Sequence, residues 1–140
     1  MTATVKASDV NVGEELKAWS YQVRREDLVA YAAASGDGNP IHQNEEFAKQ
    51  VGLPDVIAHG MHTMAKVGQY VTDWAGDPSA VVRFRSRFTK PVVVPASRGN
   101  TVTVSGRVTG KQGSTVTLQL SASTPDGSNV AEAEADVELA

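Results

Sequence analysis

Cysteine is absent from this 140-residue sequence. Its absence excludes disulfide bonds, thiolate metal sites and a cysteine nucleophile, and it permits a reducing compartment. Long apolar runs are missing too, because no segment approaches the roughly 20 apolar residues of a membrane span and residues 1–9 lack the apolar core of a signal peptide. We therefore expect a soluble protein of the cytoplasm.

An excess of basic residues is also lacking. The chain has thirteen Lys and Arg residues and sixteen Asp and Glu residues, which gives a formal net charge of −3 and a pI near 5.5. A general nucleic-acid binder needs a basic face, so we expect no nucleic-acid partner. A hydrophobic content of 41% and a charged content of 21% are typical of a folded chain. Because no internal repeat divides the sequence, residues 1–140 are expected to form a single domain.

Apolar residues recur at helical spacing in much of the first half of the chain and at alternating positions in the second half. Expected helices cover 25–35, 44–50 and 60–75, and expected strands cover 17–23, 81–88, 101–108, 115–122 and 131–139. Along 60–75, polar residues form only a narrow stripe of His62, Lys66, Gln69 and Asp73. We expect sheet to wrap around the rest of this helix, which places the chain in the α+β class.

The strands carry two further patterns. Turn-forming residues at 111–114 and 125–128 predict that the last three strands form a meander of hairpins. Three arginines alternate along 81–88 and four acidic residues alternate along the last strand, namely Arg83, Arg85, Arg87, Glu132, Glu134, Asp136 and Glu138. One interpretation is that these two strands are neighbours whose opposite charges pair on the solvent face. The alternative is that the arginines bind coenzyme A phosphates or the acidic surface of a carrier protein.

The segment 35–42, which reads Ser-Gly-Asp-Gly-Asn-Pro-Ile-His, is the first part of a candidate site. Its glycines, Asn39 and Pro40 are turn formers, and Pro40 disfavours helical geometry at Asn39. On a loop that doubles back, the Asp37 carboxylate and the His42 imidazole can point at one small reactant. This pair suits acid and base chemistry on a single water.

The segment 58–61, which reads Ala-His-Gly-Met, begins the longest expected helix and is the second part of the site. A helix start offers unpaired N–H groups and the positive end of the helix dipole. These donors can bind a carbonyl oxygen that gains negative charge during a reaction. Gly60 has no side chain, so a ligand can approach its amide closely.

Together, Gly-Asp-x-Asn-Pro-Ile-His and Ala-His-Gly-Met resemble the MaoC-type (R)-specific enoyl thioester hydratases and dehydratases. The likeness is strongest over 31–70, and the His-Gly-Met-x-Thr-Met segment is particularly similar to the catalytic beta subunit of the mycobacterial (3R)-hydroxyacyl-carrier-protein dehydratase. The resemblance implies a hotdog fold, in which an antiparallel sheet wraps around a long central helix. It also implies an acyl-CoA or acyl-ACP thioester substrate, no metal or other cofactor, and a homodimer or a heterodimer with a related hotdog subunit.

By resemblance, Asp37 and His42 remove a proton from the catalytic water and return one to Cα from the same side. The Gly60 amide is the expected oxyanion donor. Residues expected around the substrate or in support of the loop are Asn39, Ile41, His59, Met61 and Thr63. Some hydratases of this family carry a serine farther into the helix, where this chain has Ala65, and Thr63 is the nearest hydroxyl.

Alternatives accompany these assignments. The first segment alone could be a polar surface turn, and Asp37, His42 and His59 could be imagined as ligands of a divalent metal. His59 could orient the loop or cap the helix, and His62 is expected to be solvated or at an interface. The expected activity is enoyl thioester hydration or the reverse dehydration in fatty-acid metabolism. A subunit that needs a partner chain for activity and a hotdog thioesterase are the alternative functions.

Overall fold

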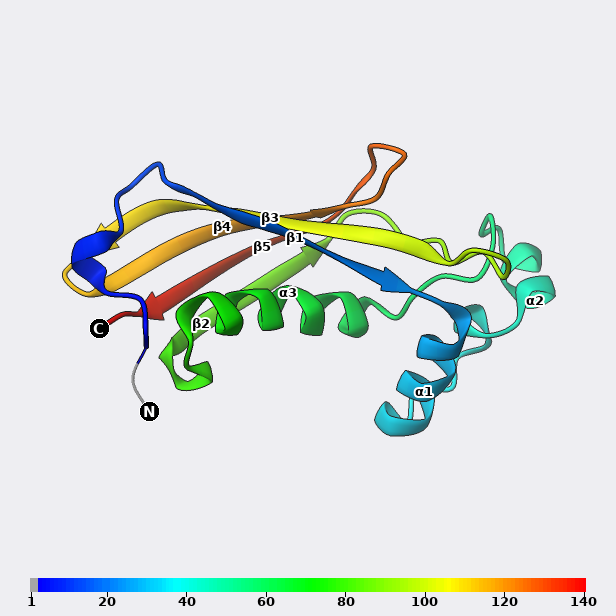
Figure 1. Ribbon diagram of the computed structural model, residues 1–140. Helices are drawn as coiled ribbons and strands as arrows, with labels where there is room; N and C mark the ends of the chain where they lie inside the picture. The colour runs from blue at the N-terminus through cyan, green and yellow to red at the C-terminus, as the bar shows by residue number, and fades with distance from the viewer. Residues whose placement is uncertain (1–2) are drawn as a thin grey trace.

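The computed structural model describes residues 3–140 of the chain. Its main elements in chain order are β1 (Glu15–Val23), α1 (Arg25–Ser35), α2 (Glu45–Gln50), α3 (Gly60–Ala75), β2 (Val81–Phe88), β3 (Asn100–Gln112), β4 (Thr115–Ser123) and β5 (Asn129–Glu138). Single 3-10 turns lie at η1 (Ala7–Asp9), η2 (Pro40–His42) and η3 (Pro78–Ala80). The strands form one layer, α3 lies along one face of that layer, and α1 and α2 lie beyond one end (Figure 1).

The sheet is antiparallel with strand order β1-β3-β4-β5-β2. The predicted meander of the last three strands is confirmed, since β4 pairs with both β3 and β5. The predicted bounds of α1, α3 and β2 agree with the structure, while β1 begins earlier and β3 ends later than expected. The α+β hotdog prediction is therefore confirmed.

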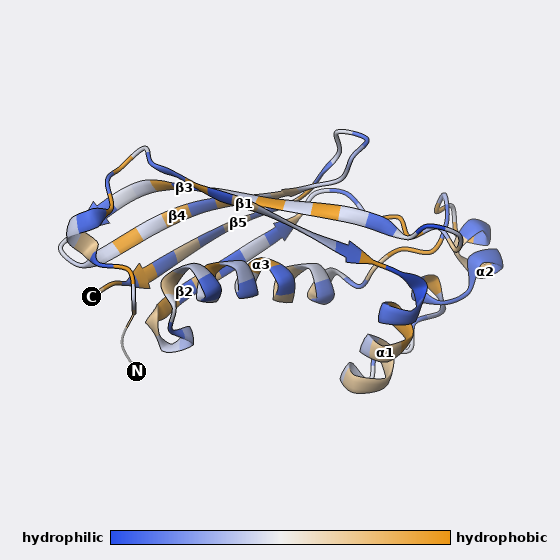
Figure 2. Cartoon of the chain, viewed as in Figure 1, coloured by the Kyte–Doolittle hydropathy of each residue, from blue (hydrophilic) through white to orange (hydrophobic). Residues whose placement is uncertain are grey.

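One face of the sheet and one face of α3 form the core. The sheet contributes alternate residues that are almost completely buried, including Val102, Val104, Leu118, Leu120, Ala135 and Val137. Figure 2 shows the alternation of apolar and polar residues along these strands. From α3, Val67 and Val71 are buried, and the Tyr70 hydroxyl donates a hydrogen bond to the carbonyl of Lys17 on β1. A Cβ at Gly106 would lie 2.8 Å from Leu120 Cδ2, so a glycine permits this tight packing.

The opposite face of α3 is not covered by any part of residues 3–140. The side of the helix that carries Met61, Ala65, Gln69 and Asp73 is exposed, and Met61 is 57% exposed. This exposed side includes Gln69 and Asp73 of the expected polar stripe and extends to Met61 and Ala65, while the sheet covers the side of the helix that carries Val67 and Val71. The edge strand β2 is similarly open, with Val82 62% exposed and Phe88 49% exposed. No helix within residues 3–140 has the combined length and apolarity of a membrane span.

Candidate active site

The loop after α1 is shaped by short hydrogen bonds. Gly36 ends α1 in the left-handed conformation, with φ of 80°, and its N–H donates to the carbonyl of Ala32. The Asp37 N–H then donates to Ser35 Oγ, and the Asn39 N–H donates to Asp37 Oδ1. These bonds turn the chain sharply and leave the second carboxylate oxygen of Asp37 pointing toward η2.

His42 closes the loop as a buried imidazole of defined orientation. Its Nδ1 lies 2.7 Å from the carbonyl oxygen of Ile57. Because a carbonyl only accepts hydrogen bonds, Nδ1 carries the proton and Nε2 keeps its lone pair. Burial lowers the pKa of His42, and the hydrogen bond to Ile57 opposes this effect only in part. His42 is therefore a neutral imidazole with an available basic nitrogen at neutral pH.

The Asp37 carboxylate and the basic nitrogen of His42 face each other across a gap. Asp37 Oδ2 lies 3.9 Å from His42 Nε2, and the Asp37 side chain is 52% exposed while that of His42 is 8% exposed. This separation is too long for a direct hydrogen bond. A water or hydroxyl at about 2.8 Å from both atoms fits the gap, so the two groups can act on the same oxygen.

His59 lies directly behind this pair. Its ring stacks on that of His42 with a centroid distance of 3.8 Å, and its Nε2 is 3.1 Å from the backbone carbonyl oxygen of Asp37. The residue precedes α3, but its side chain makes no capping hydrogen bond. Of the two structural roles expected for His59, the contacts therefore match orientation of the loop and not capping of the helix.

The N-terminus of α3 points into the same site. The carbonyl of His59 accepts the amides of His62 and Thr63, so the Gly60 and Met61 amides precede the first bonded turn. At Gly60 an added Cβ would lie 2.9 Å from Cε2 of Phe88. The absence of a side chain at Gly60 thus allows the aromatic ring of β2 to pack over the helix start, which the sequence did not indicate.

A groove of about 290 Å³ runs between these elements. Residues of the predicted site that line it are His42, Gly60 and Thr63, and the segment after β2 forms the opposite wall with Thr89, Lys90, Pro91 and Val92. The other predicted site residues do not line the groove, namely Asp37, Asn39, Ile41, His59 and Met61. Asn39 Oδ1 accepts the Ile41 amide within the loop, and Met61 lies on the exposed face of α3. His62, expected to be solvated or at an interface, is half-buried and meets Tyr31 edge-on at 5.5 Å.

The arrangement does not suit a metal ion. Asp37, His42 and His59 each place a potential ligand atom within 4.8 Å of the others. Metal-bound imidazoles direct a ring nitrogen at the ion within the ring plane, whereas these two rings are stacked with an angle of 25° between their planes. His59 Nε2 is also engaged with the Asp37 carbonyl. The cluster therefore fits a small organic reactant or water better than a divalent metal.

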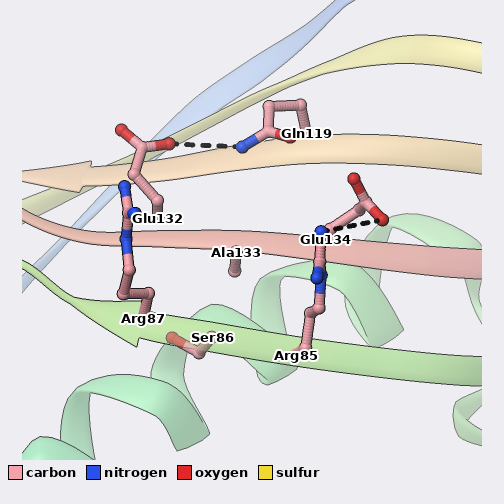
Figure 3. Close-up of a pocket in the computed structure, with 7 residues that line it drawn as sticks. All are labelled: Arg85, Ser86, Arg87, Gln119, Glu132, Ala133 and Glu134. Carbon is pink, nitrogen blue, oxygen red and sulfur yellow. Dashed lines mark hydrogen bonds and ion pairs between the residues drawn. The ribbon is translucent and has the colours of Figure 1, made fainter.

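The predicted charge pairs lie on the sheet face turned away from α3. Arg83 pairs with Asp136 at 2.6 Å and also with Glu134, and Arg85 is 3.7 Å from Glu134. In Figure 3, Arg85 and Arg87 extend from β2 toward Glu134 and Glu132 of β5, around a hollow of about 350 Å³. The prediction that these strands are neighbours with paired charges is confirmed. Binding of phosphates or of an acidic carrier by the same arginines stays a prediction.

A five-stranded antiparallel sheet with a long helix along one face is the architecture of the hotdog fold. Residues 7–125 match the family described as MaoC like domain. Because this match covers most of the chain, the protein belongs to that family.

Solved structures agree with this assignment. A structure titled MaoC-like dehydratase has a TM-score of 0.96 and 37% identity, and the match covers 99% of this chain and 43% of that chain. The R-hydratase PhaJ1 from Pseudomonas aeruginosa has a TM-score of 0.84 at 24% identity, over 99% of this chain and 87% of PhaJ1, which shows the shared fold. The HadBC dehydratase complex of Mycobacterium tuberculosis, at 20% identity over 85% of this chain and 92% of that chain, has a TM-score of 0.65 and likewise shows the fold alone.

Among curated relatives, 3-hydroxyacyl-thioester dehydratase X of Mycobacterium tuberculosis is 52% identical over 69 residues, which are 49% of this chain and 24% of the relative. The matched segment thus spans about a quarter of the length of that relative.

Proposed function

We propose that this protein catalyses the reversible (R)-specific hydration of trans-2-enoyl thioesters, which in reverse is dehydration of (3R)-hydroxyacyl thioesters in fatty-acid metabolism. The observation that carries the proposal is the 3.9 Å gap between Asp37 Oδ2 and His42 Nε2, beside the open N-terminus of α3. Acid–base groups and an oxyanion site are the two requirements of this reaction, and the candidates for both lie within one small region.

In the hydration direction, a water binds between the two side chains. The Asp37 carboxylate accepts one water hydrogen and orients the molecule, while His42 Nε2 removes the other proton as the oxygen attacks Cβ of the enoyl group. The resulting imidazolium is stabilised by the nearby carboxylate and delivers its proton to Cα on the same face. The reverse sequence removes the Cα proton and protonates the departing hydroxyl, so the chain is unchanged after each turnover.

The amide at Gly60 stabilises the charge that develops on the thioester oxygen. It lies at the first position of α3, where the helix has no carbonyl to accept it and where the dipole favours negative charge. One such donor contributes about 10²- to 10³-fold in rate. The Thr63 side chain lines the same groove and is the hydroxyl nearest to this site along the helix.

The partner of this chain is a second hotdog subunit, either another copy or a related chain. Three exposed apolar residues support this: Val82 and Phe88 on the unpaired edge strand β2, and Met61 on the uncovered side of α3. An open sheet edge of this kind pairs readily with another strand. The ChsH1-ChsH2 complex from Mycobacterium tuberculosis, whose fold this chain shares at a TM-score of 0.81, is a precedent for pairing of unlike subunits.

The proposal is tested with crotonyl-coenzyme A and the purified chain, by following the loss of enoyl absorbance. We expect hydration, and we expect the product to be oxidised by a (3R)-hydroxyacyl-specific dehydrogenase but not by a (3S)-specific one. A folded chain that is inactive alone but gains activity with a related hotdog subunit indicates the heterodimer. Release of free thiol without hydration, or a (3S) product, contradicts the proposal.

A further inference from the structure

His59 contacts two other rings, and these contacts join three parts of the fold. Its ring stacks on that of His42, which belongs to η2, at a centroid distance of 3.8 Å. It also lies 4.7 Å from the ring of Tyr31, which belongs to α1, with an angle of 50° between the ring planes. His59 itself immediately precedes α3 and is only 1% exposed. A single buried side chain therefore contacts the element before the loop, the element after it and the start of the central helix.

The same side chain contacts the loop backbone. Its Nε2 lies 3.1 Å from the carbonyl oxygen of Asp37, and this nitrogen must carry the proton because a carbonyl only accepts. The other described hydrogen bonds of Asp37 involve Ser35 and Asn39, which belong to the same turn. Within residues 3–140, the bond from His59 is therefore the one that ties Asp37 to a distant part of the chain.

Little else packs against this turn. The Asp37 side chain is 52% exposed, and an added Cβ at either Gly36 or Gly38 would meet no heavy atom within 4 Å. His42, in contrast, is held by its bond to Ile57. The separation between the exposed carboxylate and the buried imidazole thus depends on a contact that reaches both residues, and His59 supplies it.

We propose that His59 is a positioning residue that sets the distance and orientation between Asp37 and His42. The inference deepens the proposed function and rests on it for its effect on turnover. The stack acts on His42, the hydrogen bond acts on Asp37, and both originate from one rigid ring. His59 is only 1% exposed, so it acts through Asp37 and His42, which face the gap between them.

Two substitutions separate the stack from the hydrogen bond. His59→Phe keeps an aromatic ring between His42 and Tyr31 but cannot donate to the Asp37 carbonyl. His59→Gln keeps an N–H donor but removes the ring. We expect His59→Phe to lower kcat by about 10- to 100-fold with little change in KM, the size of effect that follows from misplacing a reacting group by a fraction of an ångström to an ångström.

The second variant, His59→Gln, is expected to differ from His59→Phe in both kcat and the titration of His42. His59→Gln should recover part of kcat, because a donor to Asp37 is restored, but it should change the titration of His42. The groups that face His42 are Asp37 on its own loop, His59 before α3, and Thr63 and Lys90 in the groove. Burial lowers the pKa of His42 and the neighbouring His59 adds to this effect. Removal of the ring should therefore raise the pKa of His42 toward its ordinary value and shift the acid limb of kcat/KM to higher pH.

His62→Gln is the control. His62 is also a half-buried histidine that contacts Tyr31, yet it makes no described contact with Asp37 or His42. We expect wild-type kcat and an unchanged His42 titration in this variant. Unfolding temperatures of all three variants establish that each protein is folded.

The deciding measurement is the NMR titration of the His42 ring in the wild type, His59→Gln, His59→Phe and His62→Gln, together with kcat and KM. The NMR readout needs no turnover, so it separates this inference from the proposed activity. A shifted His42 titration in His59→Gln, with a kcat loss in His59→Phe, is the expected result. An unchanged titration in His59→Gln and wild-type kcat in a folded His59→Phe would overturn the positioning role. If the wild type has no hydratase activity but the titration shifts, the proposed reaction fails and control of His42 by His59 stands.

Discussion

Two clusters of ionisable residues lie in different environments of this protein, one beside the N-terminus of α3 and one on the sheet face turned away from α3. In the second cluster, Arg83 contacts both Asp136 and Glu134 across two regular strands. Its hydrogen bond to Asp136 holds the pKa of that carboxyl below its ordinary value. In the first, Asp37 and His42 face each other at 3.9 Å from an irregular loop, and burial lowers the pKa of His42.

The two clusters differ in whether their charged and polar groups already bond to one another and in how much they are exposed to solvent. The side chains of the Arg83 cluster are partly exposed and already bonded to one another, so they fix the register of β2 against β5. In the site, a basic nitrogen is held in a largely dry position and a carboxylate oxygen stays out of direct bonding reach. A nitrogen and an oxygen that are not bonded to each other remain free to bind a reactant. Substitutions in the site should therefore change activity, and substitutions in the Arg83 cluster should not.

The largest effect is expected from loss of either member of the site pair. Asp37→Asn and His42→Ala should each lower kcat for crotonyl-coenzyme A hydration by about 10²- to 10⁴-fold, the range typical of general acid–base groups. Rates and circular dichroism of the two variants provide the measurement. A folded variant that keeps more than half of the wild-type rate would show that its residue takes no part in proton transfer.

The second expected effect is a dependence on pH. Because His42 acts as a base in its neutral form, kcat/KM should fall about tenfold per pH unit below its lowered pKa and should be level above it. Stability should change with the same sign. The unfolded chain protonates His42 near its ordinary pKa of 6.5 while the folded chain resists, so stability declines as the pH falls from 6.5 toward the folded pKa.

The pH dependence is measured by pH–rate profiles and by urea unfolding across the same range. The half-buried His62, whose pKa is also lowered by burial, adds to the decline in stability. Comparison of His62→Gln with the wild type isolates this contribution. An activity that rises as the pH falls below 6 would contradict a neutral base at position 42.

A smaller effect is expected at the helix start. Gly60→Ala places a Cβ against the Phe88 ring, which must move and thereby alters the groove beside the oxyanion amide. We expect about a tenfold loss of kcat with little change in unfolding temperature. The double variant with Phe88→Ala removes the contact and should recover activity. If Gly60→Ala, Phe88→Ala and the double variant all have the same kcat, the packing of Phe88 over Gly60 is irrelevant to the site.

The smallest effect is expected in the outer cluster. Arg83→Ala should leave kcat unchanged and lower the unfolding temperature by a few degrees at most, because exposed ion pairs contribute little. Arg85→Ala, whose single described ion pair is longer, should change even less. Thermal unfolding at low and high salt measures both variants. A loss of hydratase activity in Arg85→Ala would instead favour the role of these arginines in binding the carrier.

Much of the fold could be predicted because local signals determine it. Gly36 and Gly76 end helices in the left-handed conformation, and the side chain of Asn44 caps α2 through the Phe47 amide. The alternation along β5 and the arginines of β2 likewise predicted that these strands are neighbours. Each of these features depends on residues close in sequence or on a simple period of two.

The features that the sequence did not predict depend on contacts between distant segments. The contacts of the His59 ring with Tyr31 and His42, and the packing of Phe88 over Gly60, join segments whose approach is set by the packing of helices against the sheet. The exposure of Met61 on α3 was also not predicted, because periodicity reports apolar residues and not whether this chain supplies their partner. The sequence thus predicted Asp37 and His42 as a pair but not how His59 contacts both of them.

The most direct test of the account is a double-mutant cycle with Asp37→Asn, His42→Ala and the combined variant, measured as kcat/KM for hydration of crotonyl-coenzyme A by the active assembly. If the two residues act on one water as a unit, the combined variant loses about as much activity as the more damaging single variant. If the two losses multiply, as they do for independent groups, the residues do not share a reactant and the proposed site is contradicted.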